Sequence, residues 1–316
     1  MSGMVEDGMK VSEARVEKRP TRLLDVATLS FGGYSLRFAT EDPQVRFLVR
    51  EPHTFFLVGN IAPADCEIDC RFGDATPSSG APDFDSGGIW ELRKLPNGVE
   101  EVCFYTATAT GGRVPMIRLT LDAGIRCVQL VHAPVGGNDR TISIGYPVDE
   151  YLMARLLGKA GGIILHASAL LDGSDALVFM GHSGAGKSTI TALAESAGAE
   201  VLSDDRTIVR VRDGVVTAWG TPWHGTYSKG SPSCAVVKGI FLLVQAESNS
   251  VVPFNGARGF QEMLVRLIQP TVDFGEQDAS FVTLERLLTM VRIAELRFQP
   301  TLAAYALAQE FAKRVA

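Results

Sequence analysis

The sequence predicts an α/β fold that begins with a β-rich part. The 316 residues are 46% hydrophobic and 21% charged, a globular composition in a chain somewhat longer than one core usually supports. Short apolar segments separated by turn residues fill residues 21–146. From residue 147 onward, longer apolar strands alternate with helical patterns. We therefore expect a mobile tail at residues 1–20, a β-rich domain at residues 21–146 and an α/β domain at residues 147–316.

Charge and cysteine content narrow the class of protein. The net charge is −6 and no basic run is present, which argues against nucleic acid as a partner. The longest apolar stretches fall short of the ~18–20 residues that a membrane span needs. Residues 1–20 carry no apolar core of a secretion signal. Five scattered cysteines, an odd number, argue against a disulfide framework. We expect a cytoplasmic protein with neither a nucleic-acid nor a membrane partner.

Residues 21–146 are expected to form an antiparallel sheet or a small sandwich, because several segments alternate apolar and polar residues. Cys66 and Cys70 are four residues apart, so on a strand they share one face as small core residues. We find no catalytic constellation in this part. The expected strands cover residues 34–38, 45–49, 54–58, 66–72, 89–93, 98–108, 116–121 and 125–132, with a loop at residues 76–88.

Residues 147–316 combine helical and strand patterns. Residues 147–157 predict the first helix. Residues 162–171 predict an apolar strand that contains His166, and Asp172-Gly173 predicts a hairpin turn after it. Further strands are expected at residues 176–180, 200–205, 207–211, 215–219 and 239–244, a loop at residues 220–225, and helices at residues 189–196, 260–268, 281–293 and 301–315.

A glycine-rich loop lies between the strand at residues 176–180 and the helix at residues 189–196. It matches the pattern G-x-x-x-x-G-K-[ST], and the strand and helix on either side are the context that this pattern requires. Glycines let the backbone N–H groups approach phosphate, and the helix N-terminus adds a positive dipole. Lysine reaches the β- and γ-phosphates, and the serine hydroxyl binds Mg²⁺. The loop therefore predicts ATP and Mg²⁺ binding by Gly181, His182, Ser183, Gly184, Ala185, Gly186, Lys187, Ser188 and Thr189.

Three further polar residues are expected near this loop. Asp204 and Asp205 end the next strand, where one acid can hold Mg²⁺ opposite Ser188 and the other can accept a proton from a hydroxyl. Neighbouring residues on an extended strand point to opposite sides. The two acids therefore either share one site because the chain bends there, or have separate roles. The alternative is that they only form a turn or cap a helix. His166 lies on the strand that the hairpin places beside the loop, either as a site residue or as a core histidine.

The residues Leu165-His166, Gly181 to Ser188 and Ser203-Asp204-Asp205 together resemble the catalytic domain of the HPr kinase/phosphorylase family. The resemblance covers roughly residues 160–250. It implies a P-loop fold similar to the nucleotide-binding half of phosphoenolpyruvate carboxykinase. It also implies roles: Lys187 contacts the transferred phosphate, Ser188 binds Mg²⁺, Asp205 accepts the proton from the acceptor serine, and Asp204 assists either the metal or the geometry. His166 lies at the position of the family's active-site histidine.

The chain also departs from that family. The family's downstream glycine-rich signature carries a glutamate that binds metal and supports phosphorolysis, whereas residues 220–229 here contain no acid. The loop Gly220-Thr-Pro-Trp-His-Gly225 is closer to diverged members that are associated with peptide modification and resemble lasso-peptide kinases. Trp223 and His224 are therefore candidate substrate contacts, with packing of Trp223 and solvent exposure of His224 as the alternative. Arg258 is a further candidate for binding phosphate or an acidic substrate.

These observations predict an ATP-dependent kinase that uses Mg²⁺ and phosphorylates a serine-type hydroxyl on a peptide, a small protein or a small molecule. The missing downstream glutamate leaves a rival open, namely a nucleotide-binding scaffold or regulatory protein of a peptide-modification pathway that has lost catalysis. A decarboxylating carboxykinase is a weaker rival, because no Mn²⁺ site or dicarboxylate-binding arginine set is found. The β-rich part is expected either to recognise the acceptor or to form an interface in a homo-oligomer.

Overall fold

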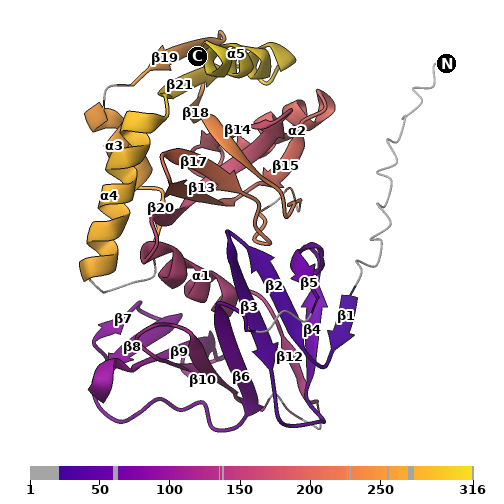
Figure 1. Ribbon diagram of the computed structural model, residues 1–316, viewed down its shortest axis with the longest axis vertical. Helices are drawn as coiled ribbons and strands as arrows, with labels where there is room; N and C mark the ends of the chain where they lie inside the picture. The colour runs from indigo at the N-terminus through magenta and orange to yellow at the C-terminus, as the bar shows by residue number, and fades with distance from the viewer. Residues whose placement is uncertain are drawn as a thin grey trace, which may run out of the picture.

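The chain has a mixed α/β fold rich in strands (Figure 1). The computed structural model describes residues 21–59, 63–134, 136, 139–225, 227, 229–254, 256–269 and 274–314. The tail expected at residues 1–20 lies outside these residues. Three sheets and five α-helices are present in the described part.

Two sheets come from the first half of the chain. The smaller sheet has the order β1–β4–β12, from Thr21–Leu24, Arg46–Arg50 and Thr141–Ser143. The larger sheet has the order β5–β2–β3–β6–β11–β10–β9–β8–β7. Its strands are, in that order, Leu57–Val58, Ala27–Phe31, Tyr34–Ala39, Cys66–Phe72, Cys127–His132, Arg113–Leu121, Glu100–Ala107, Trp90–Lys94 and Phe84–Asp85.

Of the two alternatives expected for this part, a single antiparallel sheet is wrong, because β6 pairs in parallel with both β3 and β11. The smaller and larger sheets instead share one buried core, as in a sandwich. Between β3 and β6 the chain passes through β4 of the smaller sheet and then through β5 at one edge of the larger sheet, so β6 can enter beside β3 in the same direction. This is the long connection that parallel pairing requires.

The expected strand at residues 54–58 is also corrected. His53–Phe56 is a 3₁₀-helix that buries Phe56, and only Leu57–Val58 is extended. Cys66 and Cys70 are buried on one face, as expected.

The third sheet comes from the second half. It has the order β14–β13–β16–β17–β18–β21–β19, and β15 and β20 also pair with β13. Because β14 also pairs in parallel with β18, the strands β14, β13, β16, β17 and β18 close into a ring. The bounds are Gly162–Asp172 for β13, Asp175–Met180 for β14, Glu200–Ser203 for β15, Arg206–Arg212 for β16, Val215–Trp219 for β17, Cys234–Gln245 for β18, Ser250–Pro253 for β19, Leu267–Ile268 for β20 and Ile293–Phe298 for β21.

The helices cover this third sheet from several sides (Figure 1). They are α1 (Val148–Gly158), α2 (Lys187–Ser196), α3 (Gly256–Leu264), α4 (Phe274–Met290) and α5 (Leu302–Lys313). The helices α2 and α5 share a core with β14, β18 and β21, whereas α3 and α4 share a core with β13, β16 and β17. Helix α1 lies between the first two sheets and the third.

Two helix predictions need correction. The helix expected at residues 260–268 begins earlier and ends at Leu264, and Leu267–Ile268 joins the sheet as β20. The helix expected at residues 281–293 begins at Phe274 and ends at Met290. Ile293 instead starts β21, which pairs in parallel with β18. The apolar residues of β21 are buried in the sheet, so the helical spacing that seemed to continue through Ile293 was misleading.

The two halves of the chain share buried contacts. The core under the first two sheets also contains Ile164, Ile208 and Trp223 from the second half. The Arg210 guanidinium on β16 donates a hydrogen bond to the carbonyl oxygen of Gly32 at 2.7 Å. The first half therefore packs directly against β13 and β16. Strand β13 carries His166, and β16 begins directly after Asp205.

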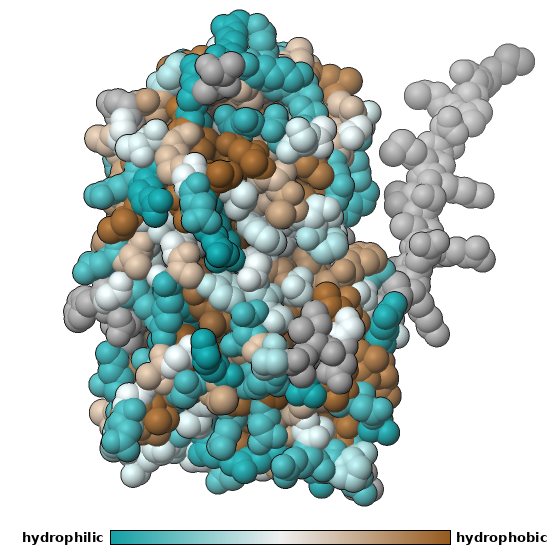
Figure 2. Space-filling model, viewed as in Figure 1, coloured by the Kyte–Doolittle hydropathy of each residue, from teal (hydrophilic) through white to brown (hydrophobic). Residues whose placement is uncertain are grey.

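The surface view shows hydrophilic residues over much of one face, with hydrophobic side chains between them (Figure 2). None of the helices in the described ranges has the length and apolar character that crossing a membrane would need.

Candidate active site

The glycine loop connects the end of β14 at Met180 to the start of α2 at Lys187. Gly184 and Gly186 have φ angles of 80° and 106°, which side-chain-bearing residues rarely adopt. A Cβ on Gly186 would lie 2.5 Å from the ring of Phe298, and a Cβ on Gly181 would lie 2.6 Å from the Cβ of Ala185. These glycines therefore allow a tight turn that packs against β21, as the sequence pattern requires.

The N-terminus of α2 opens onto a cavity. Gly186 is the N-cap residue, and as a glycine it has no side chain that could cap the helix. The N-terminus of a helix, where backbone N–H groups and the positive end of the helix dipole meet, is a favourable place for an anion. The cavity has a volume of about 350 Å³ and is lined by His166, Ser183, Gly184, Gly186, Lys187, Ser188, Thr189, Asp204, Asp205 and Gly225. We call it the loop cavity.

Three of the nine predicted loop residues do not line this cavity. Gly181 and Ala185 are buried in the turn, and His182 is exposed, with its Nδ1 2.7 Å from the carbonyl oxygen of Ser183. The other six lie at the cavity.

His166, Lys187 and Asp205 meet at the cavity because of strand register. On β13, His166 pairs with Arg206 of β16, and the next residue, Ala167, pairs with Met180 at the end of β14. The Lys187 Nζ lies 2.8 Å from the His166 Nε2, and the Asp205 Oδ1 lies 3.6 Å from the same Nε2. Lys187 also donates to the carbonyl oxygen of Gly181 at 2.9 Å.

The electrostatics of this group favour a neutral imidazole. Burial, and then the charge of Lys187, lower the pKa of His166. Burial also lowers the pKa of Lys187, which nearby carboxylates partly offset. A neutral His166 can accept the hydrogen bond from a charged Lys187 through Nε2, and this geometry fits the 2.8 Å separation.

Asp204 and Asp205 lie in the turn between β15 and β16, and both line the loop cavity. Asp204 is buried and accepts backbone N–H groups from Gly225 at 3.0 Å and Tyr227 at 2.9 Å. Burial raises the pKa of Asp204. The Asp205 Oδ2 lies 2.6 Å from the Arg206 Nη1. The two neighbouring acids thus reach one cavity by a turn rather than from one extended strand.

The donor set at the cavity fits a Mg²⁺ ion that is shared with phosphate. Among the residues that the structure describes, no group of three or more His, Cys, Asp or Glu side chains is placed to hold a metal by itself. Mg²⁺ commonly takes one or two protein oxygens and completes its shell with substrate phosphate and water. Ser188 and the buried Asp204 line the same cavity, and a cation there would offset the cost of charging Asp204.

The remaining predicted substrate residues lie outside the loop cavity. Trp223 is buried, donates through Nε1 to Asp149 at 2.9 Å and packs edge-on against Phe31, so the structure supports its packing alternative. His224 is half-buried and lies next to Gly225, which lines the cavity. Arg258 forms an ion pair with Glu295 and stacks on Phe254 at 4.3 Å. It does not line the loop cavity.

Two residues near Asp205 were not selected from the sequence. Arg206 lies 2.6 Å from Asp205 and 2.5 Å from the Glu150 Oε2. Arg206 follows the acidic pair directly and could have been noticed for that reason. Glu150 carries no sequence signal, because it is one of two acids in the first turn of α1 and reaches Arg206 only through the packing of that helix.

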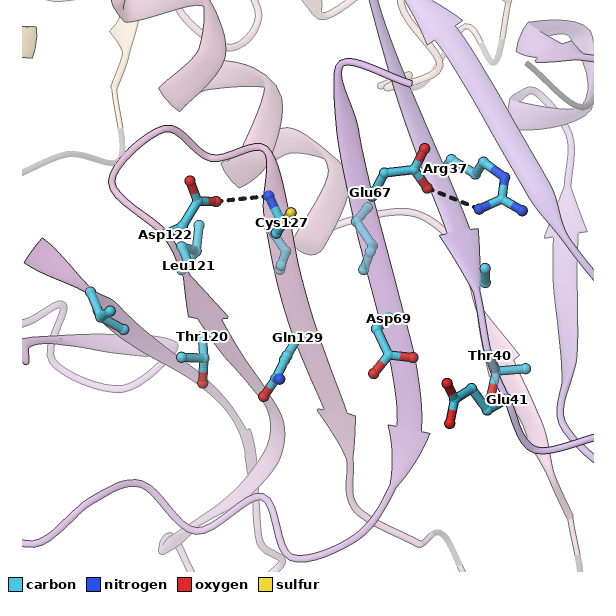
Figure 3. Close-up of a pocket in the computed structure, with 14 residues that line it drawn as sticks. Arg37, Thr40, Glu41, Glu67, Asp69, Thr120, Leu121, Asp122, Cys127 and Gln129 are labelled. Atoms are coloured by element: carbon cyan, nitrogen blue, oxygen red, sulfur yellow. Dashed lines mark hydrogen bonds and ion pairs between the residues drawn. The ribbon is translucent and has the colours of Figure 1, made fainter. Parts of the chain in front are cut away.

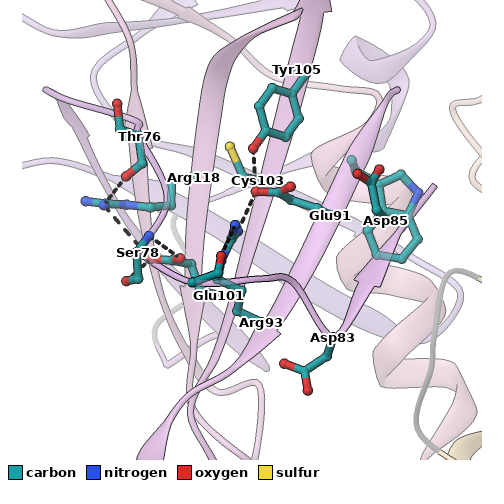
Figure 4. A network of polar contacts seen from close by, with 12 residues as sticks. Thr76, Ser78, Asp83, Asp85, Glu91, Arg93, Glu101, Cys103, Tyr105 and Arg118 are labelled. Carbon is teal, nitrogen blue, oxygen red and sulfur yellow. Dashed lines mark hydrogen bonds and ion pairs between the residues drawn. The ribbon is translucent and has the colours of Figure 1, made fainter. Parts of the chain in front are cut away.

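Other polar groups of the first half form structural networks. Glu91 bonds to Arg93 and to the Tyr105 hydroxyl, and Ser78 donates to Glu101 at 3.0 Å (Figure 4). Burial raises the pKa of the Cys103 thiol in this network to about 11, so the thiol is unreactive near neutral pH. These contacts leave the buried carboxylates paired, consistent with a stabilising role.

A groove also crosses the exposed face of the larger sheet. Its volume is about 550 Å³, and Figure 3 shows polar side chains of β3, β6, β11 and β10 along it. Arg37 pairs there with Glu67 at 2.9 Å. None of the sequence-predicted site residues lines this groove.

Comparisons with known proteins yield matches among solved structures. No protein-family model matches the chain. No curated protein sequence matches it either. Among solved structures that match is the Hpr(Ser) kinase/phosphatase from Coxiella burnetii, which is 10% identical and covers 48% of this chain and 99% of its own. The TM-score is 0.29, so the likeness is remote and assigns no activity.

Proposed function

We propose that the protein is an ATP-dependent kinase that uses Mg²⁺ and phosphorylates a serine-type hydroxyl on a peptide, a small protein or a small molecule. The observation that carries the proposal is the convergence of Lys187, His166 and Asp205 on one cavity at the N-terminus of helix α2. A phosphate site, a cation and a carboxylate base are the groups that phosphoryl transfer needs.

The loop and α2 would bind the phosphates of ATP through backbone N–H groups. Lys187 would exchange its bond to the Gly181 carbonyl oxygen for a phosphate oxygen and so place positive charge at the transferred group. Neutral His166 would hold Lys187 in this direction through Nε2. Ser188 and Asp204 would hold Mg²⁺, which supplies charge neutralisation at the phosphate oxygens.

Asp205 would act on the acceptor. Its carboxylate would accept the proton of the acceptor hydroxyl while the new O–P bond forms and the bond from the γ-phosphorus to the ADP oxygen breaks. Such a base contributes typically ~10²–10⁴-fold to the rate. The 3.6 Å between Asp205 Oδ1 and His166 Nε2 places this carboxylate beside the group that contacts Lys187.

The Asp205→Asn variant tests this proposal. Phosphoryl transfer from ATP to a pool of peptide and small-molecule acceptors should fall at least ~10²-fold, while ATP affinity stays near that of the wild type. Asp213→Asn is the matched control, because Asp213 is an exposed carboxylate in the turn that follows β16. Transfer by Asp205→Asn at the wild-type rate would contradict the assigned role of Asp205.

A nucleotide-binding scaffold without catalysis is the second candidate. One observation favours it. Among the described residues, the only acids that line the loop cavity are Asp204 and Asp205, and both already accept hydrogen bonds from N–H groups of the protein. This candidate predicts ATP binding without transfer to any member of the acceptor pool.

A further inference from the structure

Arg206 connects the Asp205 carboxylate to helix α1. Its Nη1 lies 2.6 Å from the Asp205 Oδ2, and its Nε lies 2.5 Å from the Oε2 of Glu150. The guanidinium also lies 5.7 Å from the ring centre of Tyr146. Arg206 is therefore held on two sides, while the Asp205 Oδ1 remains directed toward His166 at 3.6 Å.

The first turn of α1 anchors this arrangement. Glu150 is largely buried, and its neighbour Asp149 is fully buried. Asp149 accepts hydrogen bonds from Trp223 at 2.9 Å and lies 2.8 Å from the His53 Nε2. Helix α1 thus fixes Glu150 by packing and by contacts with two other segments, and a fixed Glu150 gives Arg206 a rigid partner.

We propose that Arg206, anchored by Glu150, is a positioning residue that aims the Asp205 carboxylate at the acceptor hydroxyl. The inference rests on the proposed kinase function and adds two residues to it. The Arg206 bond occupies Oδ2, so Oδ1 is left to face the cavity. Without this bond the carboxylate can rotate about two side-chain torsions, and a misplacement of about 1 Å can cost about 100-fold in rate.

The position of Arg206 argues against a purely structural role. In a loose phosphoryl-transfer transition state, orientation matters more than base strength. Arg206 contacts both the base and the helix at the junction of the two halves, whereas Arg210, on the same strand, links the halves without touching Asp205.

The test compares Arg206→Gln, Arg206→Lys, Glu150→Gln and the double variant, with Arg210→Gln as the control. The readouts are kcat and KM for an acceptor and the dissociation constant of ATP. Arg206→Gln should lower kcat about 10- to 100-fold with ATP affinity unchanged, and Arg206→Lys should recover part of the loss. Glu150→Gln should lower kcat less. The double variant should be no worse than Arg206→Gln alone, because Glu150 acts through Arg206.

Two results would overturn the inference: a kcat of Arg206→Gln equal to that of the Arg210→Gln control, or losses of Glu150→Gln and Arg206→Gln that multiply in the double variant. If the wild type transfers no phosphate, the kinase proposal fails. A crystal structure of Arg206→Gln then still tests whether Arg206 orients the Asp205 carboxylate. We expect the Asp205 carboxylate to leave its orientation toward His166 or to occupy several rotamers. An unchanged Asp205 would contradict the role of Arg206.

Discussion

At the scale of single residues, the candidate site is a chain of contacts that runs from Lys187 through His166 and Asp205 to Arg206 and Glu150. The first three were predicted from the sequence because a phosphate loop, an acidic pair and a histidine at fixed spacings each indicate chemistry. The last two were missed because their roles depend on distances between side chains, and spacing along the chain does not encode those distances. Trp223 is the opposite case. Its loop sequence suggested a contact with substrate, but its side chain is buried in the core.

The titration of Glu150 gives a prediction on stability. Burial raises its pKa from 4.5 to about 7, so the folded state holds the proton more tightly than the unfolded state. The resulting stabilisation is complete below pH 4.5 and is lost as the pH rises through about 7. Relative to Glu150→Gln, the wild type should therefore lose free energy of unfolding between these two pH values, by at most about 3 kcal/mol. Urea unfolding at a series of pH values measures this. A difference that stays flat or grows with pH would contradict the assigned burial.

At the scale of elements, the β14–loop–α2 unit was predicted closely, because a glycine pattern and an apolar run define its limits. The regions around it were predicted less well. The strand β21 was missed because its apolar residues follow a helix and continue its spacing. The strand β2 was missed although Gly32-Gly33, which joins it to β3, is a hairpin signal, and both glycines have positive φ angles. Its other partner, β5, follows much later in the chain, and a local pattern does not carry such pairing.

Gly186→Ala tests the conformation of the loop. An alanine at φ 106° is strained, and its Cβ would clash with the Phe298 ring at 2.5 Å. We expect a loss of about 1–3 kcal/mol in the free energy of unfolding and weaker ATP binding. Gly256→Ala is the matched control, since Gly256 begins α3 in open space. Equal stability and equal ATP affinity of the two variants would show that the loop does not have this conformation.

At the scale of the whole molecule, helix α1 joins the first two sheets to the third. Arg155 of α1 lies 2.6 Å from Glu100 of β9 and 2.6 Å from Glu276 of α4, and all three side chains are largely buried. The sequence predicted the helix and its place between two parts, but not that the parts share a core. The reason is that burial of Ile164 and Ile208 beneath the first half depends on long-range packing.

Arg155→Leu tests this connection. The change leaves the buried carboxylates of Glu100 and Glu276 without the Arg155 guanidinium, so we expect a loss of about 3–5 kcal/mol in the free energy of unfolding. Urea unfolding, followed by tryptophan fluorescence and by circular dichroism, measures the change. Arg212→Leu removes an exposed ion pair with Asp213 and should cost less than about 0.5 kcal/mol. Similar losses in the two variants would contradict a buried link through Arg155.

The central claim is that the loop cavity binds the phosphates of ATP through Lys187. Calorimetric titration of ATP with Mg²⁺ into the wild type and into Lys187→Ala tests it most directly, with adenosine as the ligand that lacks phosphates. The account predicts that the wild type binds ATP, that Lys187→Ala binds it about 10- to 100-fold more weakly because a charged hydrogen bond is lost, and that adenosine affinity does not change. Equal ATP affinity in both proteins would contradict the account.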